Sequence, residues 1–311
     1  MPIIEVKDVT YVYCPKTPYE KKALDTISMD VESGEFLGLV GANGSGKSTL
    51  VQHFNGLLLP TTGSIRVCGK AVSDKQHQSE LWKRVGLVMQ YPEQQIFEAT
   101  VFEDVSFGPR NMGLTNTEVR ERTLEALTKV GLDEAIVNLP PLCLSGGMRR
   151  RVAIAGVLAM KPEILILDEP TAGLDPAGRE MILRQLKQIQ VEENTTIIMI
   201  SHNLKEVLLV ADRLAVLEKG KLVAFGDIRE VLSHQYVREL EYINFPDYLR
   251  VIYSLAQKGQ NINTNVYSLA DAEIEIDKFL KGKKNEPTQT RAIHPRQFHY
   301  PPIRPKNKNY L

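Results

Sequence analysis

The chain has 311 residues, which is enough for one large α/β domain with an appendage or for two domains. Lysine plus arginine and aspartate plus glutamate both number 38, which excludes the overall basic charge typical of proteins that bind mainly to nucleic acid. The three cysteines, Cys14, Cys68 and Cys143, match neither a disulfide framework nor a metal knuckle and indicate a reducing compartment.

The amino-terminal segment carries charge where a secretory signal needs an apolar core, so we expect no signal peptide. No apolar run approaches the roughly 20 residues that a membrane-spanning helix needs. If the protein serves a membrane process, we therefore expect another chain to cross the bilayer.

The secondary-structure pattern alternates between strands and helices along most of the chain. Strands are predicted at 3–6, 10–13, 23–31, 36–40, 64–67, 85–89, 164–167, 195–200, 214–217 and 221–224. The pattern from 100 to 159 is helical, and helices are also predicted at 228–232, at 236–257 with an interruption at Asn244-Phe-Pro246, and at 269–280. This order predicts an α/β fold with a mostly parallel sheet and an inserted helical region.

A glycine-rich segment follows the apolar run 36–40 and reads Gly41-Ala-Asn-Gly-Ser-Gly-Lys-Ser48. It satisfies the phosphate-loop pattern, in which glycines let successive N–H groups curl around phosphate oxygens at the start of a helix. Lys47 adds a cation for the outer phosphates, and the Ser48 hydroxyl suits Mg²⁺, which prefers oxygen ligands. The sequence therefore predicts a nucleotide site here.

Two carboxylates, Asp168 and Glu169, follow the buried-strand pattern 164–167. They are expected at the carboxyl end of a parallel strand, where α/β sheets bind ligands. Asp168 can hold Mg²⁺, and Glu169 can polarise a water aimed at the terminal phosphate. An isolated Asp-Glu pair would more commonly be a solvated helix cap, but the phosphate loop favours the functional interpretation.

A third segment, Leu144-Ser-Gly-Gly-Met148, precedes a predicted helix and offers a second anion site at its start. It resembles the signature motif of the ATP-binding-cassette (ABC) ATPases. Asp168-Glu-Pro-Thr-Ala-Gly-Leu-Asp175 and Ser201-His202 strengthen the resemblance, which covers roughly residues 3–235. It implies a P-loop ATPase fold of α/β class with a mostly parallel sheet, an antiparallel β subdomain and a helical subdomain.

The resemblance also implies roles for individual residues. Catalysis would involve Glu169 as the general base, His202 as the switch at the γ-phosphate, Gln90 and Lys47. Mg²⁺ would be held by Ser48, Gln90 and Asp168. ATP would contact an adenine-stacking aromatic, for which Tyr13 is a better candidate than Tyr11, and the loop residues Gly41, Ala42, Asn43, Gly44, Ser45, Gly46, Lys47, Ser48 and Thr49.

In the ABC family two cassettes face each other head to tail, and the signature of one closes over ATP held by the other. Ser145, Gly146, Gly147 and Asp175 would therefore act in trans, and the chain is expected to be inactive alone. Met148 stands where the motif usually has glutamine, so the partner's site would lose a polar contact.

A narrower resemblance involves Tyr91-Pro-Glu-Gln-Gln-Ile-Phe97 and Thr100-Val-Phe-Glu-Asp-Val-Ser-Phe-Gly-Pro-Arg110. These segments are similar to those of energy-coupling factor (ECF) transporter ATPases of the cobalt and vitamin uptake group, and other segments resemble the second of its paired ATPases. The implied partners are a second ATPase subunit, in a hetero- or homodimer, a transmembrane coupling subunit and a substrate-capturing membrane subunit, with no nucleic acid. The chain would lie on the cytoplasmic face of the membrane.

Three regions are predicted: a nucleotide-binding domain at 1–235 with its helical insertion at about 91–160, a helical dimerisation region at 236–280, and a basic tail at 281–311. The tail has eight lysines or arginines against one acid, Glu286, and either touches anionic lipid headgroups or is a solvated, disordered end.

Alternative functions stay open within and beyond transport. An ATPase of another ABC transporter class is the main one, and an ABC protein of DNA repair or translation is disfavoured because the chain has no coiled-coil insertion and only one cassette. The transported substrate, which could be cobalt, nickel or one of several vitamins, is not expected to be encoded in this subunit.

Overall fold

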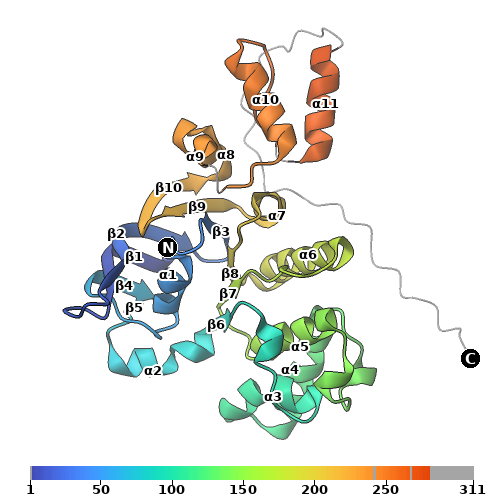
Figure 1. Cartoon of the computed structure of the whole chain (residues 1–311). Helices are drawn as coiled ribbons and strands as arrows, with labels where there is room; N and C mark the ends of the chain where they lie inside the picture. The colour runs from blue at the N-terminus through green and yellow to red at the C-terminus, as the bar shows by residue number, and fades with distance from the viewer. Residues whose placement is uncertain (1, 241–242, 267, 281–311) are drawn as a thin grey trace, which may run out of the picture.

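The computed structural model describes residues 2–240, 243–266 and 268–280 (Figure 1). The predicted basic tail, with both of its interpretations, lies outside these described residues. Strands and the helices that cover them form the middle of the molecule, with one helical group below and another above in Figure 1.

An antiparallel sheet of four strands forms one side of the molecule, in the order β2-β1-β4-β5. Its strands are β1 (Pro2–Tyr13), β2 (Lys21–Glu32), β4 (Thr62–Val67) and β5 (Lys70–Ala71). The separate strands predicted at 3–6 and 10–13 are one strand, because a register shift between Val6 and Val9, with Asp8 at φ 49°, breaks the alternation without ending the strand.

A second sheet has six strands in the order β10-β9-β3-β8-β7-β6. They are β3 (Phe36–Gly41), β6 (Val85–Val88), β7 (Ile164–Asp168), β8 (Thr196–Ile200), β9 (Arg213–Glu218) and β10 (Lys221–Asp227). All neighbours in this sheet are parallel except β9 and β10, which form an antiparallel hairpin. The predicted fold class, including the mostly parallel sheet and the antiparallel subdomain, is confirmed.

The helical region below the sheet in Figure 1 is built from α3, α4 and α5, which contact one another. Their bounds are Val101–Asn111, Asn116–Lys129 and Gly146–Leu158, with short 3-10 turns η1 (Pro92–Gln94), η2 (Glu134–Ile136) and η3 (Pro141–Cys143). Thr100 and Thr115 cap α3 and α4 with complete capping boxes, which fixes where each helix begins.

Four further helices flank the strands, and only α1 (Lys47–Phe54) is predicted from the sequence pattern. The other three are α2 (Lys75–Arg84), α6 (Pro176–Glu193) and α7 (Leu204–Val210). Only His77 and Leu81 are buried in α2, so its apolar stripe is too weak to predict a helix. Asp74 instead supports it by accepting two backbone N–H groups at its start.

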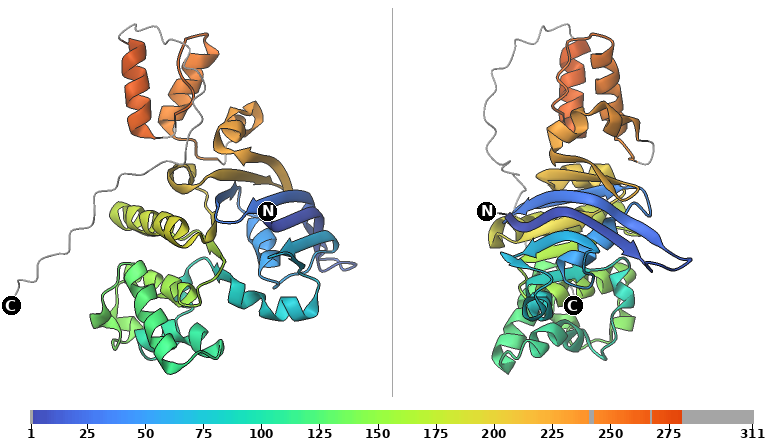
Figure 2. Two further views of the ribbon diagram at one scale, coloured as in Figure 1. Left: turned by 180° about the vertical axis from the view of Figure 1, so that it is seen from behind. Right: turned by 90° about the vertical axis from the view of Figure 1, so that its left-hand side faces the viewer.

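The carboxyl-terminal helices are α8 (Ile228–Ser233), α9 (Gln235–Glu239), α10 (Asp247–Gln257) and α11 (Leu269–Leu280). The predicted interruption before Asp247 is present, since α9 ends at Glu239 and Pro246 precedes α10. Figure 2 shows α10 and α11 side by side, at the opposite end of the molecule from α3 to α5. The dimerisation role of this region stays a prediction.

The central sheet separates two hydrophobic cores. On β7, Leu165 and Leu167 belong to the core that packs α5, α6 and α7, whereas Ile164 and Ile166 belong to the core that contains α1 and the antiparallel sheet. The strands β3 and β8 divide their side chains in the same way. Because successive side chains of a strand point to opposite faces, both faces of the sheet are buried, and functional side chains can be placed only at its ends.

Candidate functional site

The loop between β3 and α1 is shaped by close approaches of its backbone to neighbouring strands. A Cβ atom on Gly41 would lie 2.2 Å from the Leu217 carbonyl oxygen, and one on Gly46 would lie 2.6 Å from the Ala23 carbonyl oxygen. Gly46 also precedes α1 at φ 106°, a conformation that other residues rarely adopt. Only glycine fits at these two positions, so the loop geometry follows from the motif.

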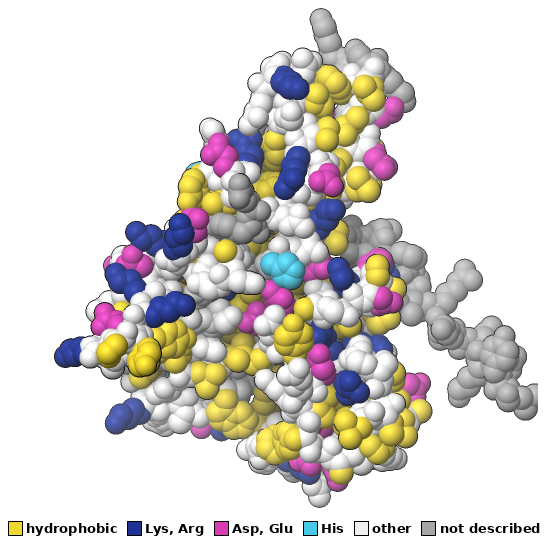
Figure 3. All heavy atoms as spheres, viewed as in Figure 1, with side chains coloured by type: hydrophobic (Ala, Val, Ile, Leu, Met, Phe, Trp, Pro, Cys, Tyr) yellow, Lys and Arg dark blue, Asp and Glu magenta, His cyan; other side chains and the backbone are white. Residues whose placement is uncertain are grey.

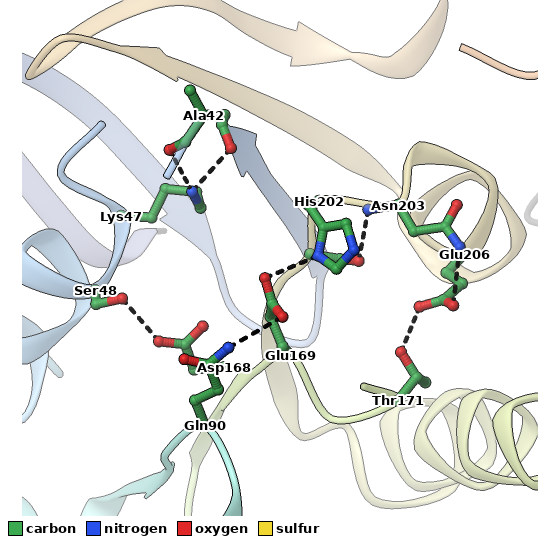
Figure 4. A network of polar contacts seen from close by, with 12 residues as sticks. Ala42, Lys47, Ser48, Gln90, Asp168, Glu169, Thr171, His202, Asn203 and Glu206 are labelled. Carbon is green, nitrogen blue, oxygen red and sulfur yellow. Dashed lines mark hydrogen bonds and ion pairs between the residues drawn. The ribbon is translucent and has the colours of Figure 1, made fainter. Parts of the chain in front are cut away.

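The Lys47 side chain lies over its own loop, where Nζ donates hydrogen bonds to the carbonyl oxygens of Gly41 and Ala42, each at 2.9 Å (Figure 4). Burial lowers the pKa of this ammonium, although the nearby carboxylates of Asp168 and Glu169 favour its charged form. The lysine thus has exchangeable backbone partners, and a phosphate group would offer it a stronger acceptor.

Asp168 ends β7, and its Oδ2 accepts a hydrogen bond of 2.7 Å from the hydroxyl of Ser48 on α1. Burial raises the pKa of this carboxyl, and the hydrogen bond from Ser48 only partly opposes the effect. A hydroxyl and a carboxylate in contact beside the phosphate loop fit Mg²⁺, which takes few protein oxygens and completes its shell with phosphate and water.

The Glu169 carboxylate lies between residues that follow two other strands. Its Oε1 is 2.9 Å from Nδ1 of His202, which follows β8, and its Oε2 accepts a hydrogen bond of 3.2 Å from Nε2 of Gln90, which follows β6 (Figure 4). Because β6, β7 and β8 are adjacent parallel strands, their carboxyl ends bring these three side chains together. Glu169 has φ 50°, a strained value of the kind that clusters at functional sites.

A hollow of about 360 Å³ lies between the phosphate loop, the start of β2 and the strand ends. Its lining includes most of the residues predicted to bind nucleotide or metal in cis, namely Tyr13, Asn43, Gly44, Gly46, Lys47, Ser48, Thr49, Gln90, Asp168 and Glu169. The predicted residues outside the lining are Gly41, Ala42 and Ser45 of the loop, and His202, whose side chain is 63% exposed.

Of the two aromatic candidates, Tyr13 lines this hollow, and its hydroxyl lies 3.1 Å from Oγ1 of Thr49. Tyr11 instead packs edge-on against Tyr13 and against the buried ring of His53. Tyr11 therefore supports the ring of Tyr13 from the side, and the geometry favours Tyr13 as the platform for a base.

The sequence interpretation missed Lys21 and Ala23, which also line the hollow. Both lie on β2, and Lys21 is placed there because its strand position pairs with Tyr13. No local motif marks them, and only the register of β1 and β2 could have identified them.

A buried network behind His202 was also missed. Glu206 accepts hydrogen bonds from the Thr171 hydroxyl and, at 3.0 Å, from Nδ2 of Asn203 (Figure 4). These contacts connect the loop after Glu169 to the start of α7. The only sign in the sequence is a glutamate on the buried face of a short helix, which has no distinctive pattern.

The predicted trans residues lie apart from this hollow. Ser145 caps α5 and accepts a hydrogen bond from the Met148 N–H at 3.3 Å, and Asp175 caps α6. Ser145, Gly147, Met148 and Asp175 line a second hollow of about 260 Å³, which has no lining residue in common with the first. A Cβ on Gly146 would meet nothing within 4 Å, so the backbone here is open to a ligand.

On the face shown in Figure 3, apolar side chains gather over the helical region below the sheet. Exposed apolar residues of that region include Phe97, Phe107 and Leu142, and the rings of Phe97 and Phe107 pack edge to face at 5.0 Å. In the part of the chain that the structure describes, no helix has the length and apolar character needed to cross a bilayer.

Comparison with known proteins finds relatives along most of the chain. The model of the ABC transporter family matches residues 24–172. The energy-coupling factor transporter ATP-binding protein EcfA2 of Clostridium perfringens is 46% identical over 280 residues, which are 89% of this chain and 98% of that protein. The protein of the same name from Lactobacillus gasseri is 41% identical, over 90% of this chain and 98% of its own length.

Solved structures give the same result for the fold. CbiO1 from Clostridium perfringens, described as part of the ABC transporter complex CbiONQ, is 38% identical and superimposes with a TM-score of 0.70, covering 83% of this chain and 97% of that one. The dimeric ATP-binding cassette MJ0796, bound to ADP and phosphate, is 29% identical with a TM-score of 0.66, covering 73% of this chain and 99% of its own.

Proposed function

The chain belongs to the ATP-binding-cassette transporter family, among the energy-coupling factor ATP-binding proteins, and we propose that it is the ATP-hydrolysing subunit of an importer for a vitamin or a transition-metal ion. It is an ABC ATPase that binds ATP, and its activity is coupled to transport. The observation that carries the importer assignment is the 46% identity that extends over 98% of an EcfA2 protein, including the carboxyl-terminal helices.

Hydrolysis would take place in the first hollow. The N–H groups of the loop and the ammonium of Lys47 would hold the phosphates, and the Tyr13 ring would stack on the adenine. Mg²⁺ would be held by Ser48, Asp168 and Gln90, and it would neutralise charge on the phosphate oxygens. The hydrogen bond of 2.7 Å between Ser48 and Asp168 supports this proposal, because it holds two oxygen groups that suit Mg²⁺ next to each other.

Glu169 is suited to accept the proton of the attacking water. His202 and Gln90 hold its two carboxylate oxygens, and this fixes the direction in which the carboxylate can accept the proton. His202, on the exposed side of Glu169, would reach the terminal phosphate when ATP is bound.

The second hollow would complete the site of a partner ATPase. Ser145, Gly146, Gly147 and Asp175 would close over ATP bound by the partner, and the partner's signature segment would close over ATP held here. The separation of the two hollows supports this arrangement, because the phosphate loop and carboxylates line only the first hollow and the signature residues line only the second. Met148 also lines the second hollow, and its apolar thioether would offer the partner's nucleotide no strong polar contact.

The partners in the membrane would be a coupling subunit and a substrate-capturing subunit, with this chain peripheral on the cytoplasmic face. The segment from Gln90 to Pro109 is the proposed contact for the coupling subunit, and it presents Tyr91, Phe97 and Phe107, which are 46%, 66% and 43% exposed. Closure of the ATPase pair on ATP would move this segment, and hydrolysis would release it.

Purification of the tagged chain in mild detergent from cells that produce it tests the proposal. We expect a second ABC ATPase and two kinds of integral membrane protein to co-purify. Vesicles that contain this complex should take up a vitamin, Co²⁺ or Ni²⁺ only when ATP is supplied on the side of the membrane where the ATPases lie. Lys47→Ala should abolish that uptake. Recovery of a permease with an extracellular solute-binding protein would instead assign the chain to another transporter class.

A further inference from the structure

Arg150, in the second turn of α5, is a buried cation that the nucleotide site does not use. Its side chain is 4% exposed, and that of its partner Glu93 is 19% exposed. The guanidinium donates two hydrogen bonds to the Glu93 carboxylate, from Nε at 3.0 Å and from Nη2 at 2.9 Å. Its remaining nitrogen, Nη1, donates to the backbone carbonyl of Ala172.

These three groups come from three segments that are distant in sequence. Glu93 lies in η1, three residues after Gln90, and Ala172 lies in the loop between Glu169 and Asp175. Arg150 itself lies on the helix that Ser145 caps. The planar side chain of Arg150 therefore connects three parts of the chain. They are η1, which follows Gln90, the loop after Glu169, and helix α5, which begins at the signature segment.

The contacts of the neighbouring arginines differ. Arg149 donates to the carbonyl of Leu144, and Arg151 donates to the carbonyls of Val130 and Gly131 and to the sulfur of Met181 on α6, so neither donates to η1 or to the loop after Glu169. Arg150 alone among these three consecutive arginines binds a carboxylate in a fork geometry, which fixes distance and angle together.

The electrostatics fit a geometric role better than a stabilising one. Burial raises the pKa of the Glu93 carboxyl, but the hydrogen bonds with Arg150, a backbone N–H and the positive charges of Arg150 and Arg149 together outweigh burial and lower the pKa, so the pair is ionic. Buried ion pairs add little net stability compared with apolar residues of the same size. A buried ion pair such as Arg150–Glu93 is therefore better explained by a need to hold the connected segments in a fixed relative position.

The η1 segment is also the part of this network nearest to the exposed apolar surface. Tyr91, between Gln90 and η1, has φ 57°, so the backbone is held in a strained conformation where the chain leaves the metal site. A push on Tyr91 or Phe97 would act on Glu93 through a segment of a few residues. The rigid fork would then carry the displacement to α5 and to Ala172.

We propose, building on the function proposed above, that Arg150 is a positioning residue that couples movement of the Gln90 to Gln94 segment to the signature turn and to the loop after Glu169. It does not touch the nucleotide. It holds the three segments in one arrangement, so that a contact made on the exposed face of η1 alters the metal site and the trans site together.

The test is a double-mutant cycle with Arg150→Gln, Glu93→Gln and the double variant, in the membrane complex that co-purifies with the chain. The readouts are kcat and KM for ATP hydrolysis, the ATP affinity of the isolated chain and its thermal midpoint. The matched control is Arg84→Gln, because Arg84 makes the same fork with Glu163, at 2.6 and 2.8 Å, on an exposed surface away from the site.

Each single variant should lower kcat by about 10- to 100-fold, the range that a small misplacement of reacting groups produces, while ATP affinity stays within about 2-fold. The double variant should be no slower than the slower single variant, since both changes remove one connection. Arg150→Lys should recover part of the activity, because an ammonium can bind Glu93 but cannot reach both acceptors in the same plane. Arg84→Gln should leave kcat unchanged.

The proposal is wrong if kcat stays within about 2-fold of wild type, or if the losses of the two single variants multiply in the double variant. It is also wrong if kcat falls only in proportion to the folded fraction. If Arg150→Gln does not fold, Glu93→Gln decides alone, because it keeps the shape of the side chain. Loss of activity in Lys47→Ala with full activity in Arg150→Gln would reject this inference and leave the ATPase assignment intact.

Discussion

Glu169→Gln removes a negative charge from the nucleotide site while keeping the size and shape of the side chain. In the wild-type chain, one carboxylate oxygen of Glu169 lies 3.2 Å from the Nε2 donor of Gln90, and the other lies 2.9 Å from Nδ1 of His202. A carboxamide can keep its oxygen toward Gln90 and turn its NH₂ toward His202, whose Nδ1 accepts a hydrogen bond in one tautomer. The cost to folding is therefore at most about one hydrogen bond, or about 1 kcal/mol.

The loss in catalysis is expected to be much larger. A carboxamide cannot accept the proton of the attacking water, and loss of a general base typically lowers the rate by about 10²- to 10⁴-fold. This corresponds to about 3–5.5 kcal/mol of transition-state stabilisation. ATP affinity should be unchanged, because the contacts of Lys47 and the loop with the phosphates do not involve this carboxylate.

The assay is the steady-state kcat of the co-purified complex at saturating ATP, with the equivalent glutamate of the paired ATPase also replaced. ATP binding and thermal midpoint are measured on the isolated chain. Glu80→Gln serves as the control, because Glu80 is 58% exposed on α2 and, among the residues that the structure describes, pairs only with Lys83, at 3.1 Å. A kcat within tenfold of wild type, or an ATP affinity that falls together with kcat, would refute the assignment of Glu169 as the base.

Three further outcomes follow from the same geometry. Tyr13→Ala should weaken ATP binding by roughly 5- to 150-fold, as expected for the loss of one base stack of about 1–3 kcal/mol. Tyr13→Phe keeps the ring and should bind ATP nearly as well as the wild-type chain. Titration with ATP checks both variants. Asp168→Asn should abolish hydrolysis and yet raise the thermal midpoint of the nucleotide-free chain at pH 7, because burial raises the pKa of this carboxyl and its ionised form destabilises the fold. The stability advantage of Asp168→Asn should be absent below the ordinary carboxyl pKa of 3.8 and should grow as the pH rises through the raised pKa, which melting curves from pH 4 to 7 can follow. Leu165→Ala should lower the free energy of unfolding by about 2–5 kcal/mol in a urea titration, because Leu165 on β7 is fully buried against the helices. Leu269→Ala should change the free energy of unfolding little, because that side chain is 59% exposed.

Much of the sheet could be predicted because its strands carry strong local patterns. The buried strands β3, β7 and β8 are short apolar runs that lead into candidate site residues, and their predicted bounds agree with the structure to within one residue. The order of the strands could not be read locally, since it depends on which crossovers the intervening helices make.

The helices that were not predicted, α2, α6 and α7, have two different reasons. The pattern of α6 is clear after Pro176, with Asp175 as its cap, but the sequence interpretation assigned Asp175 only a role in trans and did not follow the helix. The helices α2 and α7 are short, and only tertiary packing identifies their buried faces.

The site shows a similar division. Lys47, Ser48, Asp168 and Glu169 are predictable because each belongs to a motif whose residue types have a chemical reason. The positions of Lys21, Glu206 and Arg150 depend on strand register and on contacts between segments that are far apart in sequence. No periodicity or spacing records such contacts.

The partition of the hydrophobic interior by the central sheet has a consequence for how this protein can diverge among relatives. Ile164 and Ile166 share a core with α1, which starts at the phosphate loop, whereas Leu165 and Leu167 share a core with α5 to α7 and the carboxyl-terminal helices. Volume-conserving substitutions on the helices of the second side leave unchanged the core that α1 shares with Leu37 and Leu39, although Phe36 and Val40 of β3 contribute to the second core. A lineage could therefore vary the packing of these helices while the core beneath α1 stays almost unaltered.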